Sequence, residues 1–146
     1  MSSVRPDRKP LIALVHDADK AFQAHMVRSA HERGRPDIKP AHNLLFAILG
    51  DDGDRAADLA QRAGITRQSM GEVIRDLVGL GVLEMAPDPE DGRAKVVRYT
   101  AEGKRFASEG YRHLRELERV FEEEFGEEYE AAREVLQRVV GLLRGS

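Results

Sequence analysis

Hydrogen-bonding side chains near the middle of the chain are spaced for contact with the edges of DNA bases. The run Thr66-Arg67-Gln68-Ser69 is followed two helical turns later by Arg75. Gln68 and Ser69 can read base edges, whereas an arginine can hold a phosphate or a guanine. If these residues open a helix, its outward face meets DNA one turn in from the N-terminus, as recognition helices do. The alternative for the same residues is an ordinary exposed helix face.

A second group of polar residues forms a short segment between two apolar runs. Arg93 could enter a minor groove, where negative potential is concentrated, or remain a solvated charge at a hairpin tip. Lys95 and Arg98 are candidates for phosphate contacts of low specificity. We expect Asp91 to orient Arg93 through a charge-assisted hydrogen bond, because phosphate repels a carboxylate.

The elements that must position these residues follow from local patterns. Residues 55–63 predict an amphipathic helix, and Gly64 supplies the left-handed conformation of a sharp turn. Thr66 is suited to cap a second helix, which continues to Leu80 with an inward face of Met70, Val73, Ile74, Leu77 and Leu80. After Gly81, residues 82–85 and 95–100 predict a β-hairpin with a polar tip over 87–93. Helix, glycine turn, helix and hairpin make a winged helix-turn-helix, whose second helix fits a major groove.

Helices on both sides of this core carry apolar stripes of their own. The spacing of apolar residues predicts helices over 10–33, from Pro40 onward (this one central and buried), from Thr100 to about 125 and over about 127–143. A winged core cannot cover all of these stripes, and burying one such side chain contributes roughly 1.5–3 kcal/mol. We therefore expect terminal helices of two chains to interlock as a homodimer. A dimer also places two reading helices about 34 Å apart, which matches successive major grooves.

The predicted fold class is mainly α with a small β-hairpin wing: a winged helix-turn-helix core flanked by N- and C-terminal dimerisation helices. The expected organisation is a disordered tail at 1–9, an N-terminal dimerisation helix at 10–34, the winged helix-turn-helix DNA-binding lobe at 38–100 and C-terminal dimerisation helices at 101–146.

Composition bounds the classes of function. The 146 residues include no cysteine, which excludes thiol-based sensing and cysteine metal sites. No apolar run is long enough to span a membrane, so we expect a cytoplasmic protein with no membrane partner. The net charge of −3 argues mildly against binding nucleic acid, but residues 106–146 alone contribute −4, whereas 55–105 contribute +1. Attraction of phosphate depends on charges within about a Debye length, roughly 10 Å.

Signatures of catalysis, metals and cofactors are missing. The five histidines have no compact ligand spacing, so we expect ordinary surface or interface residues, no metal site and no cofactor. No serine stands in a strand–serine–helix elbow, and no glycine loop could cradle a phosphate. We therefore do not expect an enzyme.

Two segments after the reading helix carry a more specific pattern. They are Asp88-Pro89-Glu90-Asp91-Gly92-Arg93-Ala94-Lys95 and Tyr99-Thr100-Ala101-Glu102-Gly103. With the order of helices over about 10–144, they resemble the MarR family of bacterial transcriptional regulators. The resemblance implies a homodimer that binds a palindromic operator in double-stranded DNA and commonly loses affinity when a small aromatic or phenolic ligand binds. It implies that Asp91 and Arg93 correspond to the aspartate and arginine of the family's wing, which favours insertion of Arg93 into the minor groove. It also implies that residues 66–69 and Arg75 correspond to the family's base-reading positions.

The chain departs from that pattern in two places. Many members carry arginine where this chain has Met85 and Ala86, which removes phosphate contacts or partners for the wing acids. Gly71 lies within the reading helix, where glycine costs about 1 kcal/mol relative to alanine. Close approach to DNA and close approach to a packing neighbour would both explain it.

The sequence therefore predicts a dimeric MarR-like regulator, most simply a repressor. Its predicted DNA-binding residues are Thr66, Arg67, Gln68, Ser69, Arg75, Arg93 and Lys95. The alternative is a winged-helix module that binds protein instead of DNA, which the net acidity and the missing arginines favour. A third interpretation is a sensor whose ligand pocket dominates, with release of DNA as its output.

Overall fold

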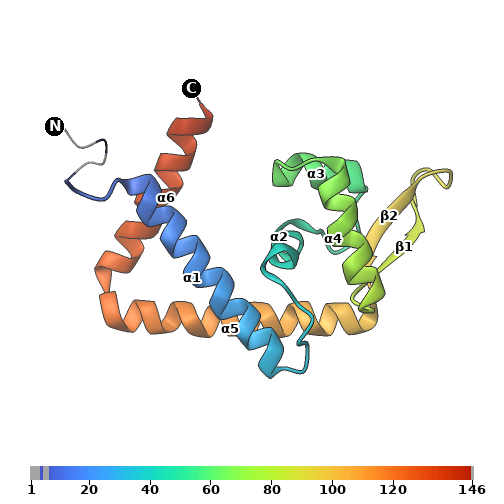
Figure 1. Cartoon of the computed structure of the whole chain (residues 1–146), viewed down its shortest axis with the longest axis horizontal. Coiled ribbons are helices and arrows are strands. Elements are labelled where there is room, and N and C mark those ends of the chain that lie inside the picture. Colours follow the sequence, from blue (N-terminus) through green and yellow to red (C-terminus); the bar gives the residue numbers. More distant parts are fainter. Residues whose placement is uncertain (1–3, 5–6, 146) are drawn as a thin grey trace. The chain divides into compact units, whose positions relative to one another are not determined.

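The computed structural model describes Val4 and residues 7–145, and its elements follow the predicted order. The helices are α1 Leu11–Glu32, α2 Pro40–Ile48, α3 Ala56–Ala63, α4 Arg67–Gly79, α5 Ala101–Phe125 and α6 Glu127–Arg144, and the strands are β1 Leu83–Pro87 and β2 Lys95–Tyr99 (Figure 1). This confirms the predicted mainly α fold with one antiparallel hairpin. Residues 1–3 and 5–6 of the predicted tail lie outside the described residues. Contacts divide the chain into one unit up to Gly110 and a second from Tyr111 onward.

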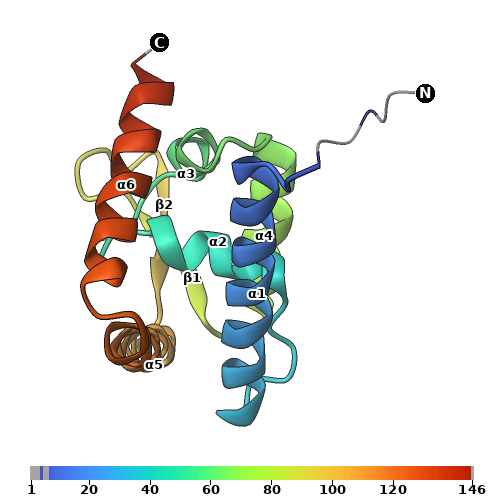
Figure 2. The same ribbon diagram turned by 90° about the vertical axis from the view of Figure 1, so that its left-hand side faces the viewer.

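The first unit packs around α2, which contacts α1, α3 and α4 (Figure 2). The largest fully buried side chains come from α2, α3, α4 and the hairpin region: Leu45, Leu59, Met70, Leu77, Leu83, His42, Val82 and Val97. The ring of Phe46 stacks on Tyr99 with centroids 6.2 Å apart and meets Phe106 edge-on at 5.4 Å. One core therefore holds the helix-turn-helix, the hairpin and the start of α5 together.

The predicted inward face of the second reading-motif helix is confirmed. Met70, Ile74 and Leu77 are buried, and Val73 and Leu80 pack against them half-buried. The prediction of a central, buried second helix is met in part. In α2, His42 and Leu45 are buried, whereas Leu44, Phe46 and Ile48 are half-buried.

Two glycines shape the junctions around the reading helix. Gly64 ends α3 with φ 69° and ψ 30°, the left-handed conformation that the sharp turn requires. Gly103 lies where α5 crosses the start of the hairpin, and a Cβ there would stand 1.9 Å from the Val82 carbonyl oxygen. Thr100 joins the same elements, because its hydroxyl donates to the Gly81 carbonyl at 2.6 Å and accepts from the Gly103 N–H at 2.9 Å.

The second unit contains the rest of α5 and α6. Gly126 joins the two helices with φ 55° and ψ −127°. Across this turn, Arg133 Nη1 lies 3.1 Å from Glu118 Oε1, and the rings of Phe121 and Tyr129 have centroids 6.4 Å apart. These contacts fix α6 against the end of α5.

Apolar side chains remain exposed in both units. In α1 they are Leu11, Ile12, Leu14 and Val15, and in α6 they include Val135, Leu136, Val140 and Leu142. Ile12 and Leu142 are 80% and 76% exposed. Of the helices described, none is both long and apolar enough to cross a membrane.

Candidate nucleic-acid interface

The reading helix α4 begins with a side-chain cap. Thr66 has extended backbone geometry, and its Oγ1 accepts a hydrogen bond from the Ser69 N–H at 3.0 Å. The same hydroxyl donates to Ser69 Oγ at 2.9 Å. The cap is as predicted. It also assigns the Thr66 hydroxyl to the helix itself, whereas the Ser69 hydroxyl keeps its own proton for a partner outside.

The outward side of α4 carries the predicted polar residues. Arg67, Gln68, Ser69 and Arg75, which we call the reading face, are all exposed. Glu72 is exposed on the same helix and adds one negative charge there. A Cβ built on Gly71 would lie 3.3 Å from Arg75 Nη1, so the Arg75 guanidinium folds back over the glycine. The structure thus brings the four predicted residues of this helix together on one exposed surface.

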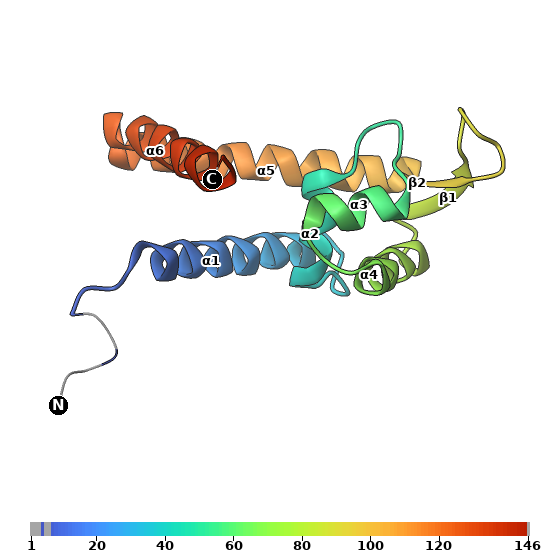
Figure 3. The ribbon, with the colours of Figure 1, turned by 90° about the horizontal axis from the view of Figure 1, so that it is seen from above.

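The wing consists of β1, β2 and the turn between them. The two strands lie side by side, with the turn extending beyond them (Figure 3). They pair from Leu83 with Tyr99 to Pro87 with Lys95, and the Asp88 N–H donates to the Ala94 carbonyl at 2.9 Å to close the turn. At its tip the Arg93 side chain is 97% exposed, which leaves its guanidinium accessible to a groove. Asp91 lies beside it, with Oδ1 3.7 Å from Arg93 Nε and 3.1 Å from the Arg93 backbone nitrogen that donates to it.

The two remaining wing cations differ in their surroundings. Lys95 is exposed at the outer end of β2. Arg98 Nε instead donates to Glu84 Oε1 at 2.9 Å, directly across the hairpin. Its charge is therefore largely matched by a neighbouring carboxylate, and Lys95 is the better candidate for a phosphate contact.

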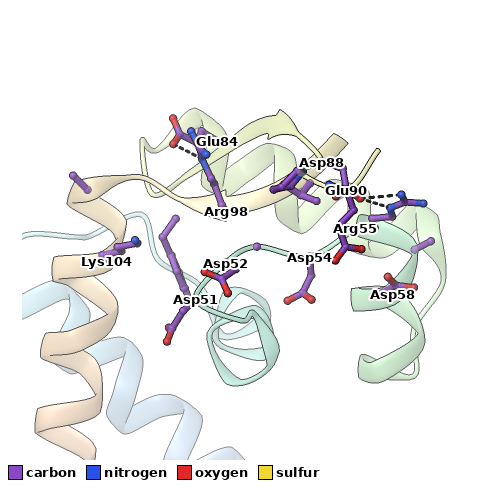
Figure 4. Close-up of a pocket in the computed structure, with 16 residues that line it drawn as sticks. Asp51, Asp52, Asp54, Arg55, Asp58, Glu84, Asp88, Glu90, Arg98 and Lys104 are labelled. Atoms are coloured by element: carbon purple, nitrogen blue, oxygen red, sulfur yellow. Dashed lines mark hydrogen bonds and ion pairs between the residues drawn. The ribbon is translucent and has the colours of Figure 1, made fainter. Parts of the chain in front are cut away.

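An ion pair that the sequence interpretation missed ties the wing to α3. Arg55, the residue before α3, places Nε and Nη2 each 2.8 Å from Asp88 Oδ2 (Figure 4). Asp88 Oδ1 accepts the Glu90 N–H at 2.9 Å. The Glu90 N–H and then the Arg55 guanidinium hold the pKa of the Asp88 carboxyl below its usual value. The Asp88-Pro89-Glu90 sequence indicates a local turn, but it does not indicate the ion pair, because Arg55 lies 33 residues away from Asp88.

The ion pair borders a cleft of about 1140 Å³ with many carboxylates in its lining, among them Asp51, Asp54, Asp58 and Glu84. Several of these groups already have partners. Asp54 accepts the Gly50 N–H at 2.8 Å and lies 3.2 Å from Arg62. Glu84 and Asp88 are paired with arginines (Figure 4). Among the residues the structure describes, no three His, Cys, Asp or Glu side chains are grouped to hold a metal ion.

His42 corrects the expectation that the histidines lie at surfaces or interfaces. It is 1% exposed in the core of the first unit. Its Nδ1 accepts the Lys39 N–H at 3.1 Å, and its Nε2 lies 3.2 Å from Asp76 Oδ2. Nε2 therefore carries the proton and donates to Asp76. The ring caps α2 and links it to the reading helix, which is a structural role.

This geometry defines a winged helix-turn-helix protein with an exposed polar reading face and a cationic wing tip. The family model described as MarR family matches residues 36–94. The transcriptional regulator HosA of Escherichia coli O111:H- is 31% identical over 91 residues, covering 62% of this chain and 66% of HosA. The match thus spans just under two thirds of that regulator's length. The segment from the start of the DNA-binding lobe to the turn of the wing, residues 36–94, therefore matches the MarR family.

Solved structures show the same fold over nearly the whole chain. The S. aureus MepR–DNA complex has a TM-score of 0.72 at 18% identity and covers 93% of this chain and 99% of that one. The PcaV regulator of Streptomyces coelicolor, solved with its natural ligand, has a TM-score of 0.66 at 24% identity and covers 97% of each chain.

Proposed function

We propose that this protein is a DNA-binding transcriptional regulator that binds a palindromic operator as a homodimer and acts as a repressor. The observation that carries the proposal is the reading face: four hydrogen-bonding residues exposed on a capped helix, beside a wing whose tip holds an almost fully exposed arginine. In this arrangement Gln68 and Ser69 contact base edges in the major groove. Arg67, Arg75 and Lys95 hold phosphates or a guanine, and Arg93 enters the adjacent minor groove.

The exposed apolar side chains of α1 and α6 support the homodimer. Leu11, Ile12, Leu14 and Val15 in one unit, and Val135, Leu136, Val140 and Leu142 in the other, are about half exposed or more. Burying each contributes roughly 1.5–3 kcal/mol, so a second copy that covers them stabilises both chains. A two-fold axis then presents two reading helices to half-sites about 34 Å apart.

A small aromatic or phenolic effector fits the same proposal. The PcaV structure contains that regulator's natural ligand, so a protein of the same fold binds a ligand. An effector that binds this chain better in its DNA-free form lowers its affinity for DNA. Aromatic carboxylates that raise the Tm in proportion to the logarithm of their concentration, and release the operator, would identify the class.

The second candidate function is a winged-helix module that binds protein. The net charge of −3 and the absence of arginines at Met85 and Ala86 favour it. The two positions differ in the structure: Ala86 is 6% exposed, whereas Met85 is 45% exposed.

Fluorescence anisotropy with the chain's own upstream DNA, measured across salt concentrations, tests the DNA-binding function. Gln68→Ala and Arg93→Ala should each weaken specific binding by about 5- to 150-fold, because a good base contact is worth about 1–3 kcal/mol. Lys95→Ala should weaken binding to all sequences alike and lower the salt slope by about 1. Gln137→Ala and Arg105→Ala, exposed on α6 and α5, are matched controls.

Two results would contradict the proposal. One is a specific complex that neither Gln68→Ala nor Arg93→Ala weakens. The other is a strictly monomeric chain by light scattering at the concentrations used for binding. Failure to bind any upstream DNA at low ionic strength would favour the protein-binding module.

A further inference from the structure

The wing is fastened to the helix-turn-helix by three consecutive residues before α3. Asp54 pairs with Val97 through two backbone hydrogen bonds, Asp54 N to Val97 O at 3.0 Å and Val97 N to Asp54 O at 2.8 Å. Gly53 allows this approach, because a Cβ there would lie 2.8 Å from the Val97 carbonyl oxygen. This backbone bridge holds the middle of β2. It does not reach the turn that carries Arg93.

The Arg55–Asp88 pair makes the second attachment, nearer the tip. Asp88 immediately follows β1, and its side chain is only 11% exposed. One carboxylate oxygen receives Nε and Nη2 of Arg55 at 2.8 Å each, and the other accepts the Glu90 N–H at 2.9 Å. Both oxygens of Asp88 are therefore bonded, one to the residue that precedes α3 and one to the turn. A charge-assisted contact of this kind fixes direction as well as distance.

The hydrogen bonds within the turn continue from Asp88 to Arg93. The Asp91 N–H donates to the Asp88 carbonyl at 3.2 Å, and the Ala94 N–H donates to the Asp91 carbonyl at 3.0 Å. Asp91 in turn accepts the Arg93 N–H at 3.1 Å. These hydrogen bonds connect Asp88 to Arg93, so the position of Asp88 helps to fix the backbone of Arg93, whose side chain is 97% exposed.

We propose that Arg55 and Asp88 are positioning residues that set the angle of the wing relative to the reading helix, so that Arg93 reaches the minor groove. The proposal rests on the DNA-binding function above and deepens it. It assigns Asp88 to the anchor between the wing and α3, and leaves Asp91 as the local partner of Arg93. Neither Arg55 nor Asp88 needs to touch DNA.

Asp88→Asn separates this role from simple electrostatics by the sign of its effect. Removing a negative charge beside DNA strengthens phosphate attraction, so electrostatics alone predicts tighter binding. Loss of the anchor predicts the opposite: binding of the full-length dimer to its operator should weaken about fivefold or more, the lower end of what one lost base contact costs. Asp52→Asn, the same change on an exposed residue of the preceding turn, should leave binding unchanged or slightly tighter.

A double-mutant cycle with Arg93→Ala distinguishes positioning from general destabilisation. If Asp88 acts through Arg93, Asp88→Asn should have little further effect once Arg93 is alanine. A merely structural defect would weaken binding in both backgrounds. Arg55→Lys keeps the charge but not the paired contact, and should fall between wild type and Arg55→Ala.

Hydrogen exchange of the free protein tests the anchor without DNA. Asp88→Asn and Arg55→Ala should each accelerate exchange at the Asp91 and Ala94 amides, with little change in α4. Unchanged exchange in the turn, or tighter DNA binding by Asp88→Asn, would overturn the proposal. If the wild type bound no DNA while the turn still loosened, the proposed function would fail and the anchor itself would stand.

Discussion

Gly71→Ala separates the stability of the reading helix from its function. Glycine within a helix is less favourable than alanine by about 0.8–1.0 kcal/mol. The added Cβ meets only the end of Arg75, at 3.3 Å from Nη1 and 4.0 Å from Cζ, and that side chain is flexible. No backbone or core atom opposes it. We therefore expect the variant to be more stable by nearly the full difference in propensity, which raises the Tm by roughly 2–4 °C for a chain of this length.

The same substitution should weaken DNA binding. The methyl group would stand on the reading face between Gln68 and Arg75, displace the Arg75 guanidinium and separate the helix from the groove. Losing the Arg75 contact alone corresponds to about fivefold or more in Kd. A variant that is more stable and binds less tightly is the expected outcome. It would place Gly71 among residues retained for function at the expense of stability.

Urea or thermal unfolding at fixed protomer concentration and anisotropy on the same preparations supply the two measurements. Gly79→Ala is the matched control, because Gly79 is exposed at the end of α4 and a Cβ there meets nothing within 4 Å. It should gain stability without losing affinity. If Gly71→Ala bound DNA as tightly as wild type, close approach would not be the reason for glycine, and the position of Arg75 in the interface would be wrong.

Three further variants test the fold beneath the interface. Gly103→Ala should unfold the protein or destabilise it by about 3 kcal/mol or more in urea, because its Cβ would lie 1.9 Å from the backbone oxygen of Val82. Thr66→Ala should lower the free energy of unfolding by about 0.5–2 kcal/mol through loss of the cap to Ser69, and Thr66→Ser should restore most of it. The pKa of Asp88 is depressed in the folded protein, so its stabilisation is fully present above the unfolded pKa, near pH 4, and is lost as pH falls through the folded pKa. Urea midpoints between pH 7 and pH 3 should therefore fall less steeply for Asp88→Asn than for wild type; equal slopes would remove Asp88 from the acid response.

Local signals in the sequence were sufficient for most of the fold. Gly64 and Thr66 predict a turn and a cap because each acts on its own backbone or on a residue three positions away. The periodicity of α4 predicts its buried face for the same reason. The hairpin follows from two β-type runs around a polar tip, and its register pairs Glu84 with Arg98. That ion pair could have been predicted from the register, because directly opposed residues on a hairpin interact.

Contacts between distant segments could not be read in the same way. Arg55 and Asp88 are separated by 33 residues, and only the packing of the hairpin against α3 brings them together. Residue type alone does not predict the burial of His42, since histidine is intermediate in its preference for burial. Its burial depends on two partners, Lys39 and Asp76, of which one comes from another helix. Tertiary structure decides both cases.

Thr100 has a consequence for how movement can spread through the DNA-binding lobe. Its hydroxyl donates to the Gly81 carbonyl just after α4 at 2.6 Å and accepts the Gly103 N–H of α5 at 2.9 Å. Because residue 103 is a glycine, no side chain separates the backbone of α5 from the backbone of Val82, which follows α4. A displacement of the start of α5 should therefore also move the segment that follows α4. In the proposed homodimer, a small molecule or a second chain that displaces α5 would change the spacing and tilt of the two copies of α4 relative to DNA.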